Sequence, residues 1–454
     1  MNNKELRLLC PNGHLGFAPI KTGSFYHGVA TRPDFILADS GSDDIGPVPL
    51  GDDTCASPLE WQKHDLEIML VEARKLGVPM IIGSAGDTGT NSRVDMYVEI
   101  IKELAAKHNL PPFKLGYFYS ELSRDYLLQK IKSNRVIQGL DGRRDLTPED
   151  IEKTDRIVAV AGVHPYMELL NVGADVIIGG RSSDCAIFAA PALRAGFPEA
   201  LCYYLGKVME CASFCCEPYG GKETIIGTIT GEDVKVTAMH PEQRCTVASV
   251  AGHAMYERSN PFYEYVAGGM MDMSACRYEQ FDEKTCRITG PQFVPAEELR
   301  IKIEGAGKVG ERYIGIAGVR DPYTIRHIDQ VIAWAREQAV ERFGATGYQL
   351  HYRVFGKNGV MGDLEPVKET CSHELCVLVE GIAPTKEMAH EVCMIGTRQM
   401  FYARLPEVKG TAGGVAFVLD EVLPASPAYT WTISHTVPVD DPMELFKTHL
   451  IEVK

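Results

Sequence analysis

Carboxylates, hydroxyls and one guanidinium gather in three short polar loops in the first half of the chain. The loops are Ala38–Asp44, Gly83–Asn91 and Gly179–Asp184. Glycines let backbone N–H groups face a ligand, Ser and Thr add hydroxyl donors, and aspartates can move protons or hold a metal. The same residue types also build ordinary strand-to-helix turns, in which Asp and Ser cap the helix. The recurrence of such a loop favours a ligand site over three separate caps.

Proton transfer next to a bound carboxylate is the chemistry that these loops suggest. Arg181 could bind a carboxylate through two parallel hydrogen bonds and stabilise the enolate-like charge that forms when an α-proton leaves. Asp87 and Asp184 could act as acid or base. Asp43 and Asp44 offer hard oxygen ligands, so Mg²⁺ is the one cofactor that the residues suggest. The remaining loop residues are expected to bind the substrate, and they are Ser40, Gly41, Ser42, Gly83, Ser84, Gly86, Thr88, Asn91, Gly180, Ser182 and Ser183.

Two histidines could move the second proton. His164 follows a predicted strand, Arg156–Ala161, and is as compatible with a structural role as with a catalytic one. His253 and Glu257 are four residues apart in a helix-like stretch, which would place both on one helix face. This pair could ligate a metal, form an acid–base pair or make a solvated contact. Arg244, shortly before it, is expected to contact the substrate.

The thirteen cysteines are scattered, and an odd number in a reducing compartment favours free thiols. Cys211, Cys215 and Cys216 lie within six residues and could ligate a metal, although buried, unligated thiols are the more common outcome. A second enzymatic interpretation is hydrolysis, with Ser182 or Cys211 as nucleophile and His253 as base. Neither a Gly-x-Ser-x-Gly elbow nor a His-Glu-x-x-His motif occurs.

The elements that must position these residues are strands that alternate with helices. Each polar loop follows a short apolar run of the kind that buried parallel strands have, and in open α/β sheets ligands bind at the carboxyl ends of the strands. The predicted strands are Phe35–Leu37, Val78–Ile82, Lys114–Tyr119, Arg156–Ala161 and Ala174–Ile178. Apolar residues at helical spacing predict helices over Leu59–Leu76, Ser92–His108 and Asp125–Lys132.

Three domains are expected from this pattern. Residues 1–225 predict a site-bearing α/β domain with a doubly wound, mostly parallel sheet. Residues 226–310 predict a β-rich subdomain of short strands separated by Gly and Pro. Residues 311–454 predict a ferredoxin-like α+β domain in the order βαββαβ. Its predicted elements are Glu311–Ala317, Tyr323–Phe343, Tyr348–Phe355, Glu374–Gly381, Lys386–Leu405 and Val415–Leu419.

Composition narrows the class of protein. The 454 residues are 45% hydrophobic and 24% charged, as in globular proteins with a sizeable core. A formal net charge of −15 argues against nucleic acid and anionic membranes as partners, because both attract basic surfaces. No apolar run is long enough to span a bilayer or serve as a signal peptide, so we expect a cytoplasmic protein. A homo-oligomer is the base-rate expectation for such a chain.

Several of these segments together resemble the acyclic terpene utilisation (AtuA) family. The matching segments are Pro79–Asn91, Gly179–Gly196, the Glu210-Cys211 stretch, His240–Pro261 and Lys302–Pro322. The resemblance covers most of the chain and implies an N-terminal α/β domain with the site, a small ferredoxin-like C-terminal domain, bacterial catabolic gene neighbourhoods and a small companion protein. The opening Leu9–Gly16 departs from the glycine-rich opening of the terpene members, which places the chain in a divergent branch.

Residues and resemblance together predict a bacterial catabolic enzyme of lyase (hydratase or ammonia-lyase) or isomerase type. Its substrate would be a small carboxylic acid or an acyl-CoA ester of one, and its reaction would start by proton abstraction next to the carboxyl. The hydrolase described above is an alternative. A non-catalytic organic-acid binding subunit that needs the companion protein is another, and it would bind acids without turning any over.

Overall fold

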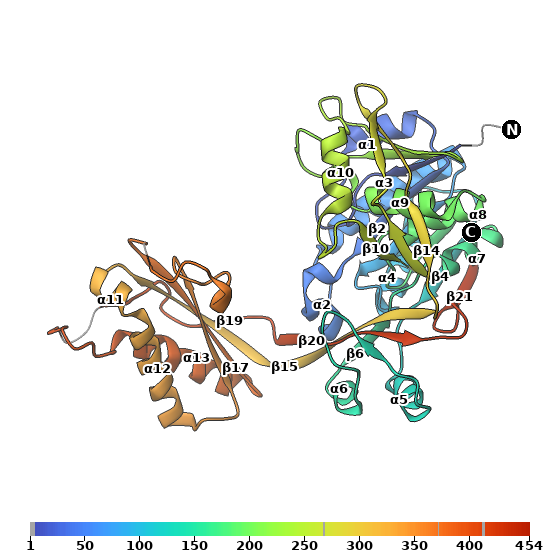
Figure 1. Cartoon of the computed structure of the whole chain (residues 1–454). Coiled ribbons are helices and arrows are strands. Elements are labelled where there is room, and N and C mark those ends of the chain that lie inside the picture. Colours follow the sequence, from blue (N-terminus) through green and yellow to red (C-terminus); the bar gives the residue numbers. More distant parts are fainter. Residues whose placement is uncertain (1–4, 267, 371, 411–413) are drawn as a thin grey trace. The chain divides into compact units, whose positions relative to one another are not determined.

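The computed structural model describes residues 5–266, 268–370, 372–410 and 414–454. The chain is of mixed α/β type and forms two compact units. The first unit consists of residues 1–306 and 431–454, and the second of residues 307–430. Figure 1 labels the elements of both units.

The centre of the first unit is the parallel part of a ten-stranded sheet. Its middle strands are apolar and entirely buried, as expected for strands covered on both faces. The parallel strands, in sheet order, are β1 (Leu6–Cys10), β2 (Phe35–Gly41), β3 (Met80–Asp87), β7 (Val176–Ile178) and β4 (Phe113–Tyr119). The predicted strands of this region coincide with β2, β3, β4 and β7, and the structure extends β2 and β3 into the polar segments that follow them.

Antiparallel strands extend this sheet on both sides. Strands from the segment 226–310 pair beyond β1, and the C-terminal strand pairs with β4, so parallel pairing is confined to the centre. The antiparallel strands are β8 (Ile225–Ile229), β9 (Val234–Ala238), β13 (Thr285–Thr289), β12 (Arg277–Gln280) and β21 (Lys447–Val453). A separate three-stranded antiparallel sheet consists of β10 (Tyr263–Val266), β11 (Gly269–Asp272) and β14 (Gln292–Pro295).

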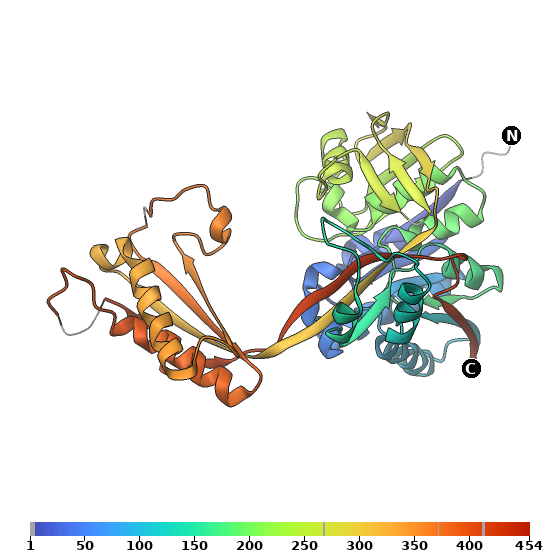
Figure 2. The same cartoon turned by 60° about the horizontal axis from the view of Figure 1, so that its bottom comes forward.

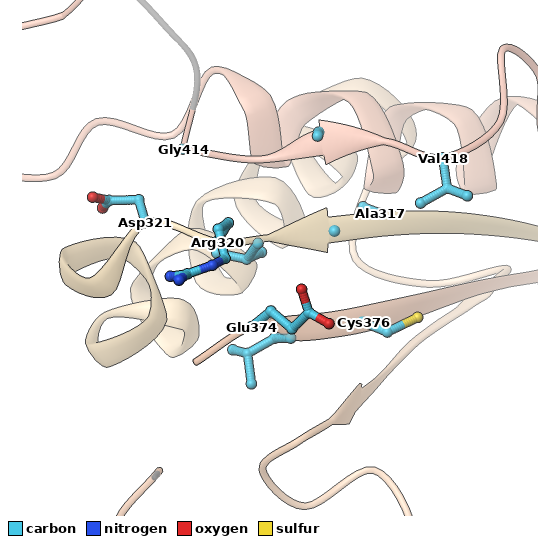
Figure 3. A pocket seen from close by; sticks show the side chains of 11 residues that line it. Ala317, Arg320, Asp321, Glu374, Cys376, Gly414 and Val418 are labelled. Atoms are coloured by element: carbon cyan, nitrogen blue, oxygen red, sulfur yellow. The ribbon is translucent and has the colours of Figure 1, made fainter. Parts of the chain in front are cut away.

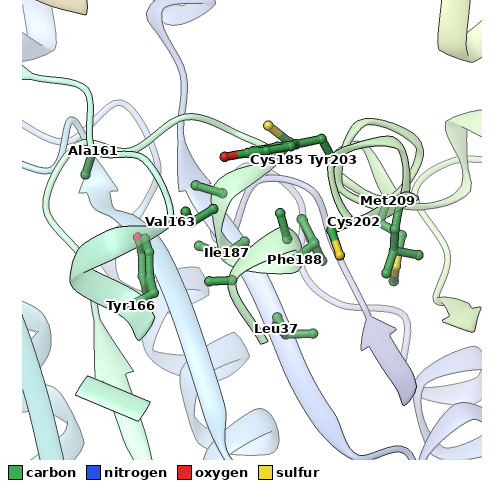
Figure 4. Packing of buried hydrophobic residues seen from close by; sticks show 14 of the residues in the cluster. Leu37, Ala161, Val163, Tyr166, Cys185, Ile187, Phe188, Cys202, Tyr203 and Met209 are labelled. Atoms are coloured by element: carbon green, nitrogen blue, oxygen red, sulfur yellow. The ribbon is translucent and has the colours of Figure 1, made fainter. Parts of the chain in front are cut away.

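Two buried hydrophobic clusters lie on opposite faces of the large sheet. Side chains alternate along β2, so that Phe35 and Leu37 join one cluster while Ile36 and Ala38 join the other. The first cluster includes side chains of α7, α8 and α9, and Figure 4 shows part of it around α8. The second includes side chains of α1, α3 and α4.

The three helices predicted in the first unit coincide with α3, α4 and α5, and the structure adds further helices to them. The helices of this unit are α1 (Thr22–Ala30), α2 (Pro47–Asp52), α3 (Leu59–Leu76), α4 (Asn91–Lys107), α5 (Arg124–Lys132), α6 (Pro148–Glu152), α7 (His164–Asn171), α8 (Ala186–Arg194), α9 (Glu199–Met209) and α10 (Val247–Met255). Shorter elements are η1 (Asp43–Ile45), β5 (Gln138–Gly139), β6 (Arg156–Ala159) and η2 (Ala212–Cys215). No helix of the described residues is both long enough and apolar enough to cross a membrane.

The second unit has an antiparallel sheet with two long helices. Strand β17 lies between β15 and β16, and two short strands also pair with β15. Helices α12 and α13 lie side by side along one face of this sheet (Figure 2). The elements are β15 (Arg300–Val319), α11 (Pro322–Arg326), α12 (Ile328–Phe343), β16 (Gln349–Phe355), η3 (Gly362–Leu364), β17 (Leu375–Ala383), α13 (Lys386–Phe401), β18 (Ala416–Phe417) and β19 (Leu423–Pro424). Strand β20 (Ala428–Pro438) begins in the second unit and lies mostly in the first.

Strand β15 serves both units, because its first residues pair with β6 of the first unit and its later residues pair with β17 of the second. Lys302 and Glu304 lie in the first part of β15 and belong to the first unit. In the sequence they fall within the predicted β-rich subdomain, shortly before the predicted third domain begins.

Candidate active site

The three polar loops meet where β2, β3 and β7 end. The backbone N–H of Ser84 donates to the carbonyl of Gly180 over 3.2 Å, and that of Arg181 donates to the carbonyl of Gly89 over 3.2 Å. Gly41 pairs with Asp87 across a bulge between β2 and β3. The carboxyl ends of neighbouring parallel strands thus bring the predicted site segments together.

The glycines of these loops permit close backbone packing. A Cβ on Gly41 would lie 2.2 Å from the carbonyl oxygen of Asp87, and one on Gly180 would lie 2.2 Å from the Ser120 hydroxyl. Gly89 has a φ of +64°, and its Cβ would lie 2.0 Å from the Arg181 backbone nitrogen. These glycines let the loop backbones approach one another and the neighbouring chain closely.

Arg181 lies at the centre of the loops with its side chain buried. Its guanidinium forms a two-point ion pair with Glu304, with distances of 2.9 and 3.3 Å, and donates to the Ser84 hydroxyl over 3.2 Å. A carboxylate oxygen of Asp184 lies 3.6 Å away and one of Asp43 lies 4.0 Å away. Glu304 thus already occupies the paired donors that the sequence suggested for a substrate carboxylate.

Asp43 belongs to this ion-pair network. Lys302 contacts Asp43 over 2.9 Å and Glu304 over 2.8 Å. Although burial opposes ionisation, Arg181 and Lys302 lower the pKa of Asp43 to about 2. Asp44 is exposed and its carboxylate does not join the network. Because cations surround Asp43, the arrangement favours ion pairing over Mg²⁺ binding by this pair.

Two other carboxyls near Arg181 have raised pKa values. Burial, reinforced by the negative charge of Asp184, raises the pKa of Asp39 to about 8. Burial also raises the pKa of Asp184, and the nearby Asp43 adds to this effect while Arg181 opposes it. With a pKa of about 8, Asp39 can hold a proton near neutral pH, and the raised pKa of Asp184 makes its ionised form a stronger base than an ordinary carboxylate.

Asp87 has a different environment that keeps it ionised. It accepts hydrogen bonds from the hydroxyl and the backbone N–H of Ser57 over 2.6 and 3.0 Å, and contacts His14 Nε2 over 2.8 Å. These bonds outweigh burial and lower its pKa. Asp87 therefore fixes the loop after β1 to β3, and its lone pairs are taken by the protein.

A pocket of about 200 Å³ opens on the other side of Asp184. Its lining is almost entirely charged or polar, and consists of Ser183, Asp184, Cys185, Lys207, Glu210, Glu257, Arg258 and Glu264. Lys207 contacts Glu210, and Arg258 contacts Glu264. Burial raises the pKa of Glu210 to about 8 despite Lys207, and it also raises the pKa of Glu264.

His253 lies beside this pocket and is buried. Donor atoms of Glu210, Cys211 and His253 all lie within 4.8 Å of one another. Burial lowers the pKa of His253 to about 3, and burial raises the pKa of Cys211 to about 12. Lys207 forms an ion pair with the Glu210 carboxylate. This contact favours ion pairing over metal binding by Glu210.

Glu257 corrects one expectation of the sequence. Helix α10 ends at Met255, and Glu257 has a φ of +69° beyond that end. His253 and Glu257 therefore do not share a helix face. The apolar spacing predicted a longer helix because spacing alone does not indicate the residue at which a helix ends.

Other predicted residues are placed outside the charged pocket. His164 begins α7 and is half-buried, and Arg244 is exposed and joins Glu217 through its backbone. Asn91 begins α4 and its backbone N–H donates to Glu121 over 2.9 Å. Ser42 and Thr88 line a much smaller pocket on the Asp43 side of Arg181.

The predicted hydroxyls and glycines mostly face the protein interior. Ser40 bonds to the Tyr97 hydroxyl over 2.6 Å, and Ser182 bonds to the Tyr166 hydroxyl over 2.6 Å. A Cβ on Gly83 would lie 2.8 Å from Asp39, and Gly86 has a φ of +60°. Ser183 alone among the hydroxyl residues lines the charged pocket.

Eight charged or titratable residues around the site were missed by sequence reasoning, and they are His14, Asp39, Lys207, Glu210, Arg258, Glu264, Lys302 and Glu304. His14 follows β1 and Asp39 lies near the end of β2, so the same strand-end rule could have found both. The others lie on or directly after α9, between α10 and β11, or on β15, where no spacing distinguishes them from surface charges.

A larger pocket of about 410 Å³ lies in the second unit (Figure 3). Its charged residues, Arg320, Asp321 and Glu374, are all exposed. Asp321 caps α11 by accepting the Thr324 backbone N–H over 2.7 Å. The buried, charged pocket of the first unit is better suited to chemistry.

Fold and site thus define a mixed α/β protein with a buried charged network at the carboxyl ends of its parallel strands. The family model "Acyclic terpene utilisation family protein AtuA" matches residues 58–436, and the chain belongs to this family. Membership implies a role in acyclic terpene utilisation, which is compatible with a catabolic function. No curated protein and no solved structure matches the chain.

Proposed function

We propose that the chain is a bacterial catabolic enzyme of lyase or isomerase type, which acts on a small carboxylic acid or its acyl-CoA ester by removing a proton next to the carboxyl. One observation carries this proposal: Asp184 and Glu210, both with raised pKa values, line the same pocket as the cations Lys207 and Arg258. One carboxyl that can take a proton and one that can give a proton, beside two cations, suit a substrate that is an anion and exchanges protons.

The cations of the pocket suit an anionic group. Lys207 contacts Glu210, whose carboxyl, with a pKa of about 8, can hold or release a proton near neutral pH. Lys207 and Arg258 line the pocket and would face a substrate carboxylate or the carbonyl oxygen of a thioester. A volume of about 200 Å³ accommodates the head of a small acid.

The proposed reaction gives each carboxyl one role. Asp184 in its ionised form, which Arg181 favours, would take the α-proton of the substrate. As the substrate C–H bond breaks, its electron pair would move to the carbonyl oxygen near the cations. Glu210 would return a proton to the leaving hydroxyl or amine, or to another carbon in an isomerisation. Arg181 acts in this scheme as a positioning residue, because Glu304 holds its paired donors.

The hydrolase interpretation has less support. The Ser182 hydroxyl is buried and bonded to Tyr166, and burial raises the pKa of the Cys211 thiol. A nucleophile of either kind would need an accessible, activated oxygen or sulfur.

Further proposals concern the protein's setting. The order β18-β15-β17-β16, with α12 and α13 between the strands in sequence, supports a ferredoxin-like plan for the second unit. Helix side chains in both hydrophobic clusters support a doubly wound centre in the first unit. We also propose a cytoplasmic homo-oligomer that works with a small companion protein.

A ligand screen with matched variants tests the function. Thermal shift against dicarboxylates, hydroxy acids, amino acids and acyl-CoA esters, each with and without Mg²⁺, would identify a binder, because a ligand of the folded state raises Tm. Turnover of that binder should fall by roughly 10²-fold or more in Asp184→Asn and Glu210→Gln. Glu223→Gln is the control, since Glu223 is similarly buried but does not line the pocket.

Binding without turnover would instead identify an acid-binding subunit, and turnover restored by an added companion protein would explain it. Unchanged turnover in Asp184→Asn would rule out the assigned base.

A further inference from the structure

Three cysteines from two separate segments converge in the core of the first unit. The Sγ atoms of Cys215, Cys216 and Cys245 lie within 4.8 Å of one another, and all three side chains are buried. Cys215 ends η2, Cys216 follows it, and Cys245 lies just before α10. Cys211, which the sequence grouped with the first two, is not part of this set.

We propose that Cys215, Cys216 and Cys245 bind one thiophilic metal ion, Zn²⁺ or Cu⁺, through their thiolates. The proposal is independent of the function proposed above. Sulfur is the ligand that such ions select in proteins.

The distances suit a shared ion. Metal–sulfur bonds of about 2.3 Å separate two sulfurs of a tetrahedral site by about 3.8 Å. The Cys216 and Cys245 sulfurs are 3.3 Å apart, and no pair in the set exceeds 4.8 Å. The expected sulfur–sulfur separation of about 3.8 Å lies between these two distances, so rotations of the side chains would bring the three sulfurs into place.

The backbone holds the two cysteine segments together. Glu217 and Arg244, the neighbours of Cys216 and Cys245, exchange two backbone hydrogen bonds of 2.9 Å each. The Ser249 hydroxyl donates to the Cys215 carbonyl over 2.8 Å. The site is therefore arranged before any ion binds, and the backbone of Arg244 gains a structural explanation.

A helix begins beside the three cysteines. Cys245 lies just before the N-terminal end of α10, where the N–H groups of the first turn favour negative charge. An ion here would join η2 to α10 and so stabilise the segments that carry Cys211 and His253.

Metal analysis of the full-length protein tests the proposal. The protein is expressed in media with added zinc or copper and purified under reducing conditions without chelators. We expect about one ion per chain, with X-ray absorption showing sulfur ligands at about 2.3 Å. Co²⁺ in place of the native ion should give the sulfur-to-metal charge-transfer absorption of thiolate ligation.

Variants separate this site from other thiols. Cys216→Ser should lower metal affinity at least about tenfold, whereas Cys202→Ser, a change at a buried cysteine outside the set, should leave the metal content unchanged. Absence of metal from both preparations would overturn the proposal. So would full metal content in Cys216→Ser, or a native mass lighter by the two hydrogens of a Cys216–Cys245 disulfide. If Cys216→Ser does not fold, the absorption spectrum of the unmodified protein still decides.

Discussion

At the scale of residues, the site depends on a balance of charges around the buried ion pair of Arg181 and Glu304. Asp43, Asp184 and Glu304 all lie within 4.0 Å of its guanidinium, and Lys302 contacts two of these carboxylates. Buried charges tolerate loss of a partner poorly, because the remaining charge stays away from water. The energetic role of Arg181 can therefore be measured separately from catalysis.

Arg181→Met should lower the free energy of unfolding by about 3 kcal/mol, because it removes the two-point partner of buried Glu304 and leaves it with the ion pair to Lys302. Urea unfolding of the purified variant measures this loss. Lys102→Met, which removes one exposed ion pair with Glu99, should change stability by less than about 1 kcal/mol. The double variant with Glu304→Gln should lose less than the sum of the two single changes. A loss below about 1 kcal/mol for Arg181→Met would contradict the buried network.

His253 should make the folded state sensitive to acid. Its pKa is lowered by burial to about 3 in the folded chain, whereas an unfolded chain binds the proton near the ordinary value of about 6.5. Between these values the unfolded state holds more protons, so stability falls as the pH falls, by about 1.4 kcal/mol per pH unit at most. His253→Phe should flatten this dependence below pH 6.5. Urea unfolding at several pH values measures it, with the exposed His27→Gln as control. Equal slopes in all three proteins would refute the assignment.

At the scale of elements, loop-to-loop packing decides where Arg181 lies. Gly89 and Arg181 come from the loops after β3 and β7, and they are joined by a backbone hydrogen bond. Only glycine fits at this position, because of its φ of +64° and because a Cβ would overlap the Arg181 backbone.

Gly89→Ala should destabilise the protein at least twice as much as Gly77→Ala. Both residues have a positive φ, but a Cβ on Gly77 would meet no neighbour within 4 Å. The strain alone costs about 1 kcal/mol, and the overlap at Gly89 adds the movement of the Arg181 loop. Thermal unfolding of the two variants, followed by the ligand-induced Tm shift, measures both effects. Equal losses with intact binding would show that the loops adapt freely.

At the scale of the whole molecule, the charged site is contained in the first unit. The chain leaves this unit after Ala306 and returns at Trp431. Close to these points, the Thr432 hydroxyl donates to the Gly305 carbonyl over 3.1 Å. The two ends are therefore near enough to be joined by a short turn.

Replacing residues 307–430 by a short Gly-Ser turn should leave a folded first unit that retains the site. We expect the acid identified by the screen to raise the Tm of this shortened protein as it does that of the full chain, because Lys207, Glu210, Asp184 and Arg181 are all present. The full chain with Asp184→Asn serves as the reference for a damaged site. A folded but unresponsive shortened protein would show that the second unit takes part in binding.

The sequence by itself determined the apolar strands, the helices at clear helical spacing and the polar loops at the ends of β2, β3 and β7. These are local features, because the hydrophobic periodicity that indicates a strand or a helix can be read from neighbouring residues. The family resemblance, drawn from motifs such as Pro79–Asn91, is confirmed by the family model.

Only the tertiary structure decided which charges meet. Arg181 and Glu304 are 123 residues apart, and Lys302 and Asp43 are 259 apart. The residues next to a carboxylate or an ammonium group do not indicate which distant charge it will contact. The network therefore forms only when β15 pairs with β6. The same holds for Cys245, which lies close to Cys215 and Cys216 because the neighbouring residues Arg244 and Glu217 form a backbone bridge. It also holds for Glu257, which lies beyond the end of α10 and so does not share a helix face with His253. Long-range packing determines which of the many charged residues lie next to one another. It thereby places the loops at the strand ends together in one site.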